Sequence, residues 1–309
     1  MSKLIQTVFA VAVLLAANSA WCQSGVFPAR PIRMVVGFTP GGQPDITARM
    51  LAPKLYEAFG QQVIVDNRPG AGGVVAAKIV ADAAPDGHTL LFVSSSHVAI
   101  PAVRAKLPYD TIRDFAAITL TSTACYVLVV PATLNVKTTQ DLIALAKAKP
   151  GQLNYGSGGI GNGAHLAGEL FKLATSTDIV HVPYKGAAPA VVDLLAGQVQ
   201  IMLNSIPVML PQIRAGKLRA LAVGADHRMA ILPEIPTMHE AGVSSFDANS
   251  WYGFFAPSGT PRDIVARLNT ESARILRSAE MRDFMGQQGA DAIGNTTEEF
   301  AAHIRAELA

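Results

Sequence analysis

Charged residues and cysteines are scarce in this 309-residue chain, and both shortages narrow its possible functions. Only 16% of the residues are charged and the formal net charge is +2, so no field attracts a nucleic acid or another polyanion. Hydrophobic residues make up 50% of the chain, which excludes disorder and provides for a substantial core. The length predicts one large domain or two of ordinary size.

The two cysteines, Cys22 and Cys125, exclude a disulfide framework. Cys125 lies in the apolar run "ACYVLVV", where a lone cysteine is typical of a core position. Residues 1–22 have a short positive start, an apolar run and small residues, which is the pattern of a secretory signal peptide too short to span a membrane. A lipid-modified Cys22, disfavoured by the bulky Trp21, and an uncleaved anchor are the alternatives. A large exported protein without disulfides indicates the bacterial periplasm.

Sequence signatures of common catalytic sites are also missing. The chain has no G-x-S-x-G, H-E-x-x-H or G-x-x-x-x-G-K-[ST] motif and no closely spaced Cys/His metal ligands. This absence favours a binding protein over an enzyme. Serines and histidines can still converge in space, so a dehydrogenase that uses a glycine-rich turn and a hydrolase that uses Ser94 or Ser157 remain alternatives.

Strands and helices alternate along the chain, beginning with the apolar strand 32–38 and a helix that Pro44 opens and Gly60 ends. Such alternation predicts an α/β fold with mostly parallel sheets flanked by helices. Two apolar strands, 125–131 and 250–257, are interpreted as crossings between two lobes, and the final helices as returning to the first lobe. The predicted domains are a signal peptide at 1–22, lobe 1 at 24–124 plus 251–309, and lobe 2 at 125–250.

Glycine-rich turns lie between a strand and a helix in both lobes, in "VVGFTPGGQPDI" and "LNYGSGGIGNGAHLAGELF". Because ligands of open α/β sheets bind beyond the carboxyl ends of the strands, these turns are expected on opposite walls of one cleft. The second turn spells G-x-G-x-x-G, the dinucleotide fingerprint. It lacks the acidic residue at the end of the following strand, which ends in Tyr184 and Lys185, so a nucleotide is disfavoured.

A glycine turn before a helix exposes N–H groups at the positive end of the helix dipole, which suits an anion. Ser157 and Asn162 add short hydrogen-bonding side chains, and the absence of arginine favours a carboxylate over a phosphate. The alternative is a tight turn whose glycines only permit positive φ. In the first lobe the expected contacts are Phe38, Thr39 and the N–H groups up to Gln43. Asp45 is expected to stabilise the first helical turn instead of contacting the anion.

Polar residues at other strand ends extend the predicted cleft. Ser94 and Ser96 close one strand, His97 is interpreted as a strand-end turn residue, and Asn204 with Ser205 closes a later strand. Lys185 either attracts acids or is a solvated loop residue, and His165 is expected to be buried or to cap its helix.

The order of these motifs resembles the substrate-binding receptors of tripartite tricarboxylate transporters, also called the Bordetella uptake gene family. The motifs that carry the resemblance cover residues 26 to 305, and they include "VVGFTPGGQPDITARMLAPKL", "VIVDNRPGAGG", "KLPYDTIRDF", "QLNYGSGG", "VHVPYKGAAPAVVDLLAGQV" and "SWYGFFAPSGTP".

The resemblance implies a periplasmic binding protein with a type II-like two-domain fold and no cofactor, which hands a small organic acid to membrane permease subunits. We expect a monomer without a metal site. A sensor kinase is an alternative partner. The residues that it implies as ligand contacts are Phe38, Thr39, Gly42, Gln43, Pro44, Asp45, Ser157, Gly158, Gly159, Asn162, His165, Tyr184, Lys185 and Asn204. Members of the family often have glycine and then threonine or serine before the aspartate. The Gln43–Pro44 pair departs from this, so the ligand's identity does not transfer.

Overall fold

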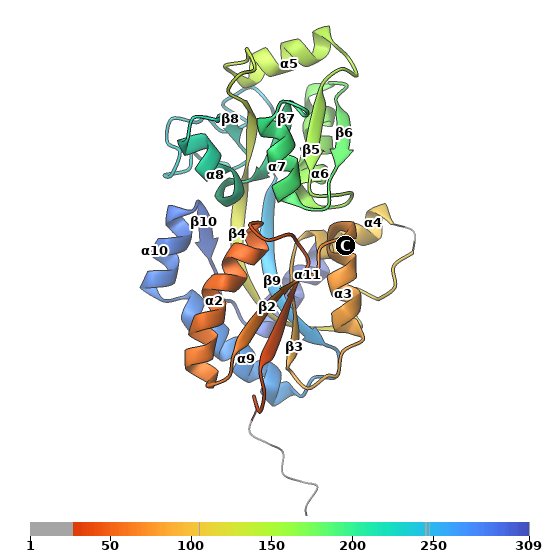
Figure 1. Ribbon diagram of the computed structural model, residues 1–309, viewed down its shortest axis with the longest axis vertical. Coiled ribbons are helices and arrows are strands. Elements are labelled where there is room, and N and C mark those ends of the chain that lie inside the picture. Colours follow the sequence, from red (N-terminus) through yellow and green to blue (C-terminus); the bar gives the residue numbers. More distant parts are fainter. Residues whose placement is uncertain (1–26, 105, 245, 247, 309) are drawn as a thin grey trace, which may run out of the picture.

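Two α/β lobes joined by two long strands make up the structure, a computed structural model that describes residues 27–104, 106–244, 246 and 248–308 (Figure 1). The connecting strands are β4 (Phe115–Pro131) and β9 (Asn249–Pro257), which pair antiparallel. The prediction of two crossing strands is confirmed, although β4 begins ten residues before the predicted crossing. The predicted signal peptide lies outside the described residues, and the exact domain boundaries stay a prediction.

The sheet of the first lobe has the order β2-β1-β3-β9-β4, with β10 also pairing with β4. β1 is parallel to β2 and β3, whereas β9 is antiparallel to β3 and β4. The α/β prediction is therefore confirmed, but the sheets are mixed, whereas the prediction was of mostly parallel strands. The further strands of this lobe are β1 (Ile32–Val36), β2 (Val63–Asn67), β3 (Thr89–Ser94) and β10 (Ala290–Ala292).

The sheet of the second lobe has the order β4-β7-β5-β6, with β8 also pairing with β4, and β5 is parallel to both neighbours. Its strands are β5 (Asn154–Ser157), β6 (Val180–Pro183), β7 (Ile201–Ser205) and β8 (Leu218–Val223). The helices that cover it are α5 (Thr139–Ala148), α6 (Gly163–Thr175), α7 (Ala187–Leu195) and α8 (Ile206–Arg214).

Helices also cover both faces of the first lobe's sheet (Figure 1). They are α2 (Gln43–Phe59), the 3₁₀ turn η2 (Ala71–Gly73), α3 (Val74–Ala81), α4 (Ser96–Val103), α9 (Arg262–Leu276), α10 (Ala279–Gln287) and α11 (Thr297–Leu308). The expectation that the final helices return to this lobe is confirmed. Leu276 of α9 packs in the cluster on one face and Phe300 of α11 in the cluster on the other.

Each lobe has a hydrophobic core on both faces of its sheet because successive strand residues point to opposite sides. In β3, Phe92 packs with α2 and α9 while its neighbour Leu91 packs with α3 and α11. In β4, Leu128 and Val127 are divided in the same way between the two cores of the second lobe. At roughly 1.5–3 kcal/mol per fully buried large side chain, these cores stabilise each lobe. None of the helices in the described part of the chain is long and apolar enough to span a membrane.

Local signals in the sequence position α2 as predicted. Pro44 stands in its first turn, and Gly60 ends it in the left-handed conformation at φ 69°. Asp45 accepts a hydrogen bond from the N–H of Gly41 at 3.0 Å, which ties the preceding glycine turn to the helix. The helix therefore begins at the gap between the lobes, where its N-terminus is available to a ligand.

Candidate functional site

Four helix N-termini converge on a cavity of about 40 Å³ between the lobes. α2 contributes from the first lobe, and α6, α7 and α8 contribute from the second. The cavity is lined by Phe38, Gly42, Gln43, Pro44, Ser94, Tyr126, Asn162, Gly163, Ala164, Ala187, Asn204, Ser205, Val208, Ser250 and Tyr252. Because the first N–H groups of a helix have no partner within it and carry partial positive charge, this arrangement suits an anion.

Neutral polar groups complete the wall of the cavity, and no charged side chain is among the described residues that line it. Tyr126 and Tyr252 rise from β4 and β9 at the back of the cavity, and burial raises the pKa of both phenols. They therefore stay protonated and can donate hydrogen bonds. No cluster of three or more metal-binding side chains occurs among the described residues.

One polar atom of the lining is buried without a hydrogen-bond partner. It is Oε1 of Gln43, whose side chain is 2% exposed. The nearby Thr39 Oγ1 is also buried without a hydrogen-bond partner. A buried polar atom without a partner costs about 1–3 kcal/mol, so a polar ligand that bonds to these groups recovers part of this cost. The cavity is thus chemically suited to a polar ligand.

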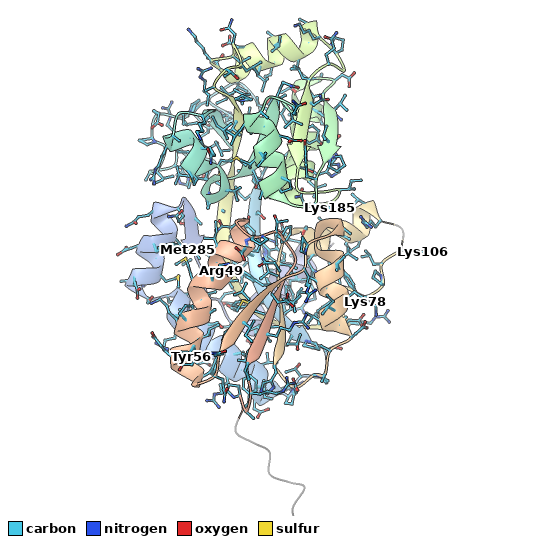
Figure 2. The ribbon with its side chains drawn as sticks, viewed as in Figure 1. Arg49, Tyr56, Lys78, Lys106, Lys185 and Met285 are labelled. Atoms are coloured by element: carbon cyan, nitrogen blue, oxygen red, sulfur yellow. The ribbon has the colours of Figure 1, made fainter. Side chains whose placement is uncertain are left out.

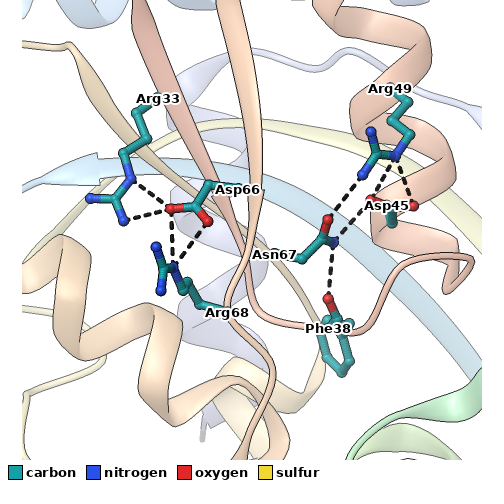
Figure 3. A network of polar contacts seen from close by, with 7 residues as sticks. All are labelled: Arg33, Phe38, Asp45, Arg49, Asp66, Asn67 and Arg68. Carbon is teal, nitrogen blue, oxygen red and sulfur yellow. Dashed lines mark hydrogen bonds and ion pairs between the residues drawn. The ribbon is translucent and has the colours of Figure 1, made fainter. Parts of the chain in front are cut away.

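Hydrogen bonds among Asn67, Asp45 and Arg49 hold the glycine turn of the first lobe (Figure 3). The amide nitrogen of Asn67 donates to the carbonyl of Phe38 at 3.0 Å and to the carboxylate of Asp45 at 2.9 Å. Arg49 donates to the carboxylate of Asp45 and to the side-chain oxygen of Asn67. Burial alone would raise the pKa of Asp45, but hydrogen bonds from Arg49, Gly41 and Asn67 hold it below its usual value. Asp45 is an ionised anchor for the turn, 3% exposed, and is not among the residues that line the cavity.

The glycine turn of the second lobe is fixed by side chains behind it. Ser157 Oγ lies 2.6 Å from Nε2 of His181 and accepts the N–H of Gly159 at 3.2 Å. Asn162 caps α6, its Oδ1 accepting the N–H of His165 at 2.9 Å. A serine hydroxyl beside a histidine resembles the start of a hydrolase site. Ser157 is however 0% exposed and is not among the residues that line the cavity.

The lobes touch each other through glycine residues beside the cavity. A β-carbon on Gly161 would lie 2.9 Å from Val103 and 3.0 Å from Ile100 of the first lobe, and one on Gly72 would lie 3.1 Å from the carbonyl oxygen of Ile160. The backbones of the two lobes thus approach as closely as glycine allows. The cavity is small because the lobes are closed over it.

The sequence-predicted residues divide into two groups. The cavity is lined by Phe38, Gly42, Gln43, Pro44, Ser94, Asn162 and Asn204. The lining, as far as the chain is described, does not include Thr39, Asp45, Ser96, Ser157, Gly158, Gly159, His165, Tyr184 or Lys185. Whether any of them contacts a ligand stays a prediction.

Specific contacts show where the side chains of several residues in the second group are directed instead. The hydroxyl of Ser96 donates to the carbonyl of Gly72, and that of Tyr184 donates to Asp193 at 2.6 Å. Lys185 is exposed near the gap between the lobes (Figure 2). Strand β3 ends at Ser94, and α4 begins at Ser96. Ser96 and His97 therefore belong to α4 and do not form a strand-end turn. His97 is buried among the rings of Tyr109, Phe115 and Phe255.

Sequence reasoning missed the back wall of the cavity, which Tyr126, Ser250 and Tyr252 form. The available signal was the interpretation of "CYVLVV" and "SWYGFF" as crossing strands, because crossing strands pass behind an interlobe cleft. Missing as well were the first residues of α6 and α7, which lie immediately after the predicted turns. They are Gly163, Ala164 and Ala187.

The chain matches the family model for the tripartite tricarboxylate transporter family receptor over residues 47–309. Among curated proteins, it is 40% identical to a protein encoded in the tcbD-tcbE intergenic region of Pseudomonas sp. (strain P51), over 91% of this chain and 84% of that protein. It is 37% identical to BugT of Bordetella pertussis, over 100% of this chain and 95% of that protein.

Solved structures of related proteins are also similar to this chain. Rpa4515 of R. palustris, solved with adipate, has a TM-score of 0.89 and 36% identity, over 91% of this chain and 95% of that one. MatC from Rhodopseudomonas palustris, solved with bound malate, has a TM-score of 0.86 and 32% identity, over 91% of this chain and 97% of that one. The site described above therefore lies in a fold shared with proteins that hold dicarboxylates.

Proposed function

Because this chain belongs to the receptor family of tripartite tricarboxylate transporters, a family of periplasmic solute-binding proteins, we propose that it captures a small organic carboxylate in the periplasm. It then delivers the acid to the membrane permease subunits of such a transporter. It acts as a monomer that uses no cofactor and catalyses no reaction.

The convergence of four helix N-termini on a cavity without a charged side chain carries this proposal. Each terminus stabilises a nearby anion by about 0.3–1 kcal/mol in exposed settings and more where it is partly buried. A carboxylate needs two or more hydrogen-bond donors around its oxygens, and the N–H groups of Gly163 and Ala164 in the first turn of α6 are such donors. The hydroxyl groups of Tyr126 and Tyr252 add further donors at the back wall.

The ligand is a di- or tricarboxylate, an acidic amino acid or an aromatic acid. The adipate and malate in the two related structures support the first class. Gln43 and Pro44 line the cavity on the side of the first lobe, so these two residues set which acid fits. The buried hydroxyl of Ser157, which lies 2.6 Å from His181, supports binding without catalysis.

Delivery depends on lobe closure, as in other two-domain binding proteins. The glycine contacts between the lobes give the closed form a surface that neither lobe has alone, and a permease subunit that recognises it binds the loaded receptor. A sensor kinase is the alternative partner. Capture of the purified permease subunits and of the sensor's extracytoplasmic domain, with and without ligand, distinguishes the two.

Isothermal titration calorimetry of the mature chain tests the proposal. The titrants are adipate, malate, citrate, glutamate and benzoate, with adipamide as a neutral control of the same length as adipate. We expect at least one acid to bind with a Kd below about 100 μM and adipamide not to bind. If none of the acids binds, or if adipamide binds as well as adipate, the proposal is wrong.

A further inference from the structure

Two histidines stand directly behind the second-lobe glycine turn, residues 157–162, and each bonds to it. Nε2 of His181, on the edge strand β6, lies 2.6 Å from Ser157 Oγ at the start of the turn. Nδ1 of His165, in the first turn of α6, accepts the N–H of Gly161 at 3.2 Å near the end of the turn. The turn is therefore tied at both ends to side chains outside it.

The two imidazole rings also pack on each other, with 4.3 Å between their centroids. Behind them, Tyr155 stacks on His181 at 4.7 Å, and its hydroxyl donates to Glu169 of α6 at 2.6 Å. Tyr155 reaches this position because Gly168 of α6 has no side chain to obstruct its ring. The core of the second lobe thus fixes the positions of both rings relative to the turn.

The turn connects these histidines to the ligand site. It ends at Asn162, and Asn162, Gly163 and Ala164 line the cavity. Its Gly161 also makes the contact with Ile100 and Val103 of the first lobe. A shift of the turn therefore moves both the N–H groups offered to the ligand and the surface on which the lobes close.

We propose that His165 and His181 form a positioning pair that holds the glycine turn in its ligand-binding geometry. Neither ring lines the cavity, so the pair acts through Ser157 and Gly161 and not by contact with the ligand. Its effect on ligand affinity rests on the proposed function, whereas its effect on the turn exists in the unliganded protein. The pair does for this turn what Asn67, Asp45 and Arg49 do for the turn of the first lobe.

Both rings are neutral, which the bond of His165 requires because a protonated Nδ1 cannot accept an N–H. Burial is the main cause that lowers the pKa of His165, and Lys172 lowers it further while Glu169 opposes the shift. Burial, followed by the neighbouring His165, lowers the pKa of His181 to about 4. The pair therefore keeps its hydrogen-bonding pattern at neutral pH.

Paired variants separate hydrogen bonding from ring packing. His165→Phe and His181→Phe keep an aromatic ring and lose the bond. His165→Asn places an acceptor where Nδ1 stood, and His181→Gln places a polar group where Nε2 stood. His227, which is 76% exposed in the loop after β8 and is not among the residues that line the cavity, supplies the control His227→Phe. If the histidines only fill space, the Phe variants behave as the wild type and the amide variants are worse.

Amide hydrogen exchange of the unliganded protein, read by NMR at Gly159 and Gly161, is the first measurement. We expect exchange roughly tenfold faster at Gly161 in His165→Phe and at Gly159 in His181→Phe, restored by Asn and Gln respectively. The second measurement is the Kd of the acid that binds the wild type. The Kd should rise about tenfold in each Phe variant, return towards the wild-type value in the amide variants and stay unchanged in His227→Phe.

The outcomes distinguish the two proposals. If the Phe variants exchange as slowly as the wild type, the positioning pair is refuted whether or not an acid binds. If the exchange changes as expected but no acid binds the wild type, the positioning pair stands and the proposed function fails. If an acid binds and its Kd is the same in the Phe variants, the pair does not position the ligand site and that part of the inference is wrong.

Discussion

Thr39 of the first lobe and Gly186 of the second lie against each other at the edge of the cavity. A β-carbon on Gly186 would lie 2.9 Å from Cβ of Thr39, and the φ of Gly186 is +136°, which side chains rarely adopt. The lobes therefore meet backbone to side chain at this point. Gly186 directly precedes α7, so the same residue that allows closure also begins one of the four helices around the cavity.

Adding a methyl group to Gly161 should hinder closure of the lobes in addition to lowering the stability of the fold. Gly161→Ala places a β-carbon 2.9 Å from Val103 across the gap, at a φ of +81°. Gly197→Ala is the matched control, because Gly197 has a φ of +76° and no neighbour within 4 Å of the added carbon. Both variants should lose about 1 kcal/mol of stability from the backbone conformation.

Only Gly161→Ala should weaken ligand binding, by roughly tenfold in calorimetry. The double variant Gly161→Ala/Val103→Ala should recover part of the affinity, since the smaller side chain makes room. Equal affinities of Gly161→Ala and Gly197→Ala would show that closure does not pass through this contact.

Removing the amide of Asn67 should loosen the first-lobe turn and the cavity together. Asn67→Ala loses the donors to Phe38 and Asp45 and leaves a buried carboxylate with fewer partners. We expect a loss of about 1–3 kcal/mol in chemical denaturation and a weaker Kd. The neighbouring Asp66→Asn breaks ion pairs with Arg33 and Arg68, which are 40% and 52% exposed (Figure 3). It should cost less than about 1 kcal/mol and leave the Kd unchanged.

Ser205→Ala should weaken ligand binding with little effect on stability. Ser205 Oγ is fully buried in the lining of the cavity and makes no cap bond to α8. Its removal takes a hydrogen-bonding group from the ligand, which should bind about five- to tenfold more weakly. Thr138→Ala, which removes the cap of α5 far from the site, should lower the melting temperature and spare the Kd. An unchanged Kd for Ser205→Ala would contradict this assignment.

His97 should make the protein less stable in mild acid. Burial lowers its pKa in the folded protein to about 4, against about 6.5 when unfolded. The unfolded chain therefore binds the proton more readily below pH 6.5, and stability falls as the pH falls towards 4. Between about pH 7.5 and pH 5 this one residue accounts for about 2 kcal/mol. Urea denaturation of His97→Phe should show a smaller loss between the two pH values, and an unchanged loss would exclude His97 as its source.

Local patterns of the sequence predicted most of the fold. The residues Pro44, Asp45 and Gly60 define α2 because start, first-turn charge and end are properties of neighbouring residues. The glycine turns likewise placed the helix N-termini at the cleft. The inserted second lobe followed from two apolar strands, since strands that cross between lobes are buried on all sides.

The missed parts of the site depend on contacts that are distant in sequence. The hydroxyl of Ser157 lies against His181, 24 residues later, and no local pattern reveals this contact. Tyr126, Ser250 and Tyr252 reach the cavity because of how β4 and β9 pair, and this pairing shifts its register between Ala117 and Thr119 and again between Leu120 and Ser122. Such irregularities decide which side chains face the cleft.

A crystal structure of the mature chain with its tightest-binding acid tests the central claim most directly. The account predicts one carboxylate of the acid between the lobes, with its oxygens about 2.7–3.2 Å from N–H groups at the starts of α2, α6, α7 or α8 and no cationic side chain in contact. An acid bound elsewhere, or one held by the ammonium of Lys185 or another charged side chain, would contradict it.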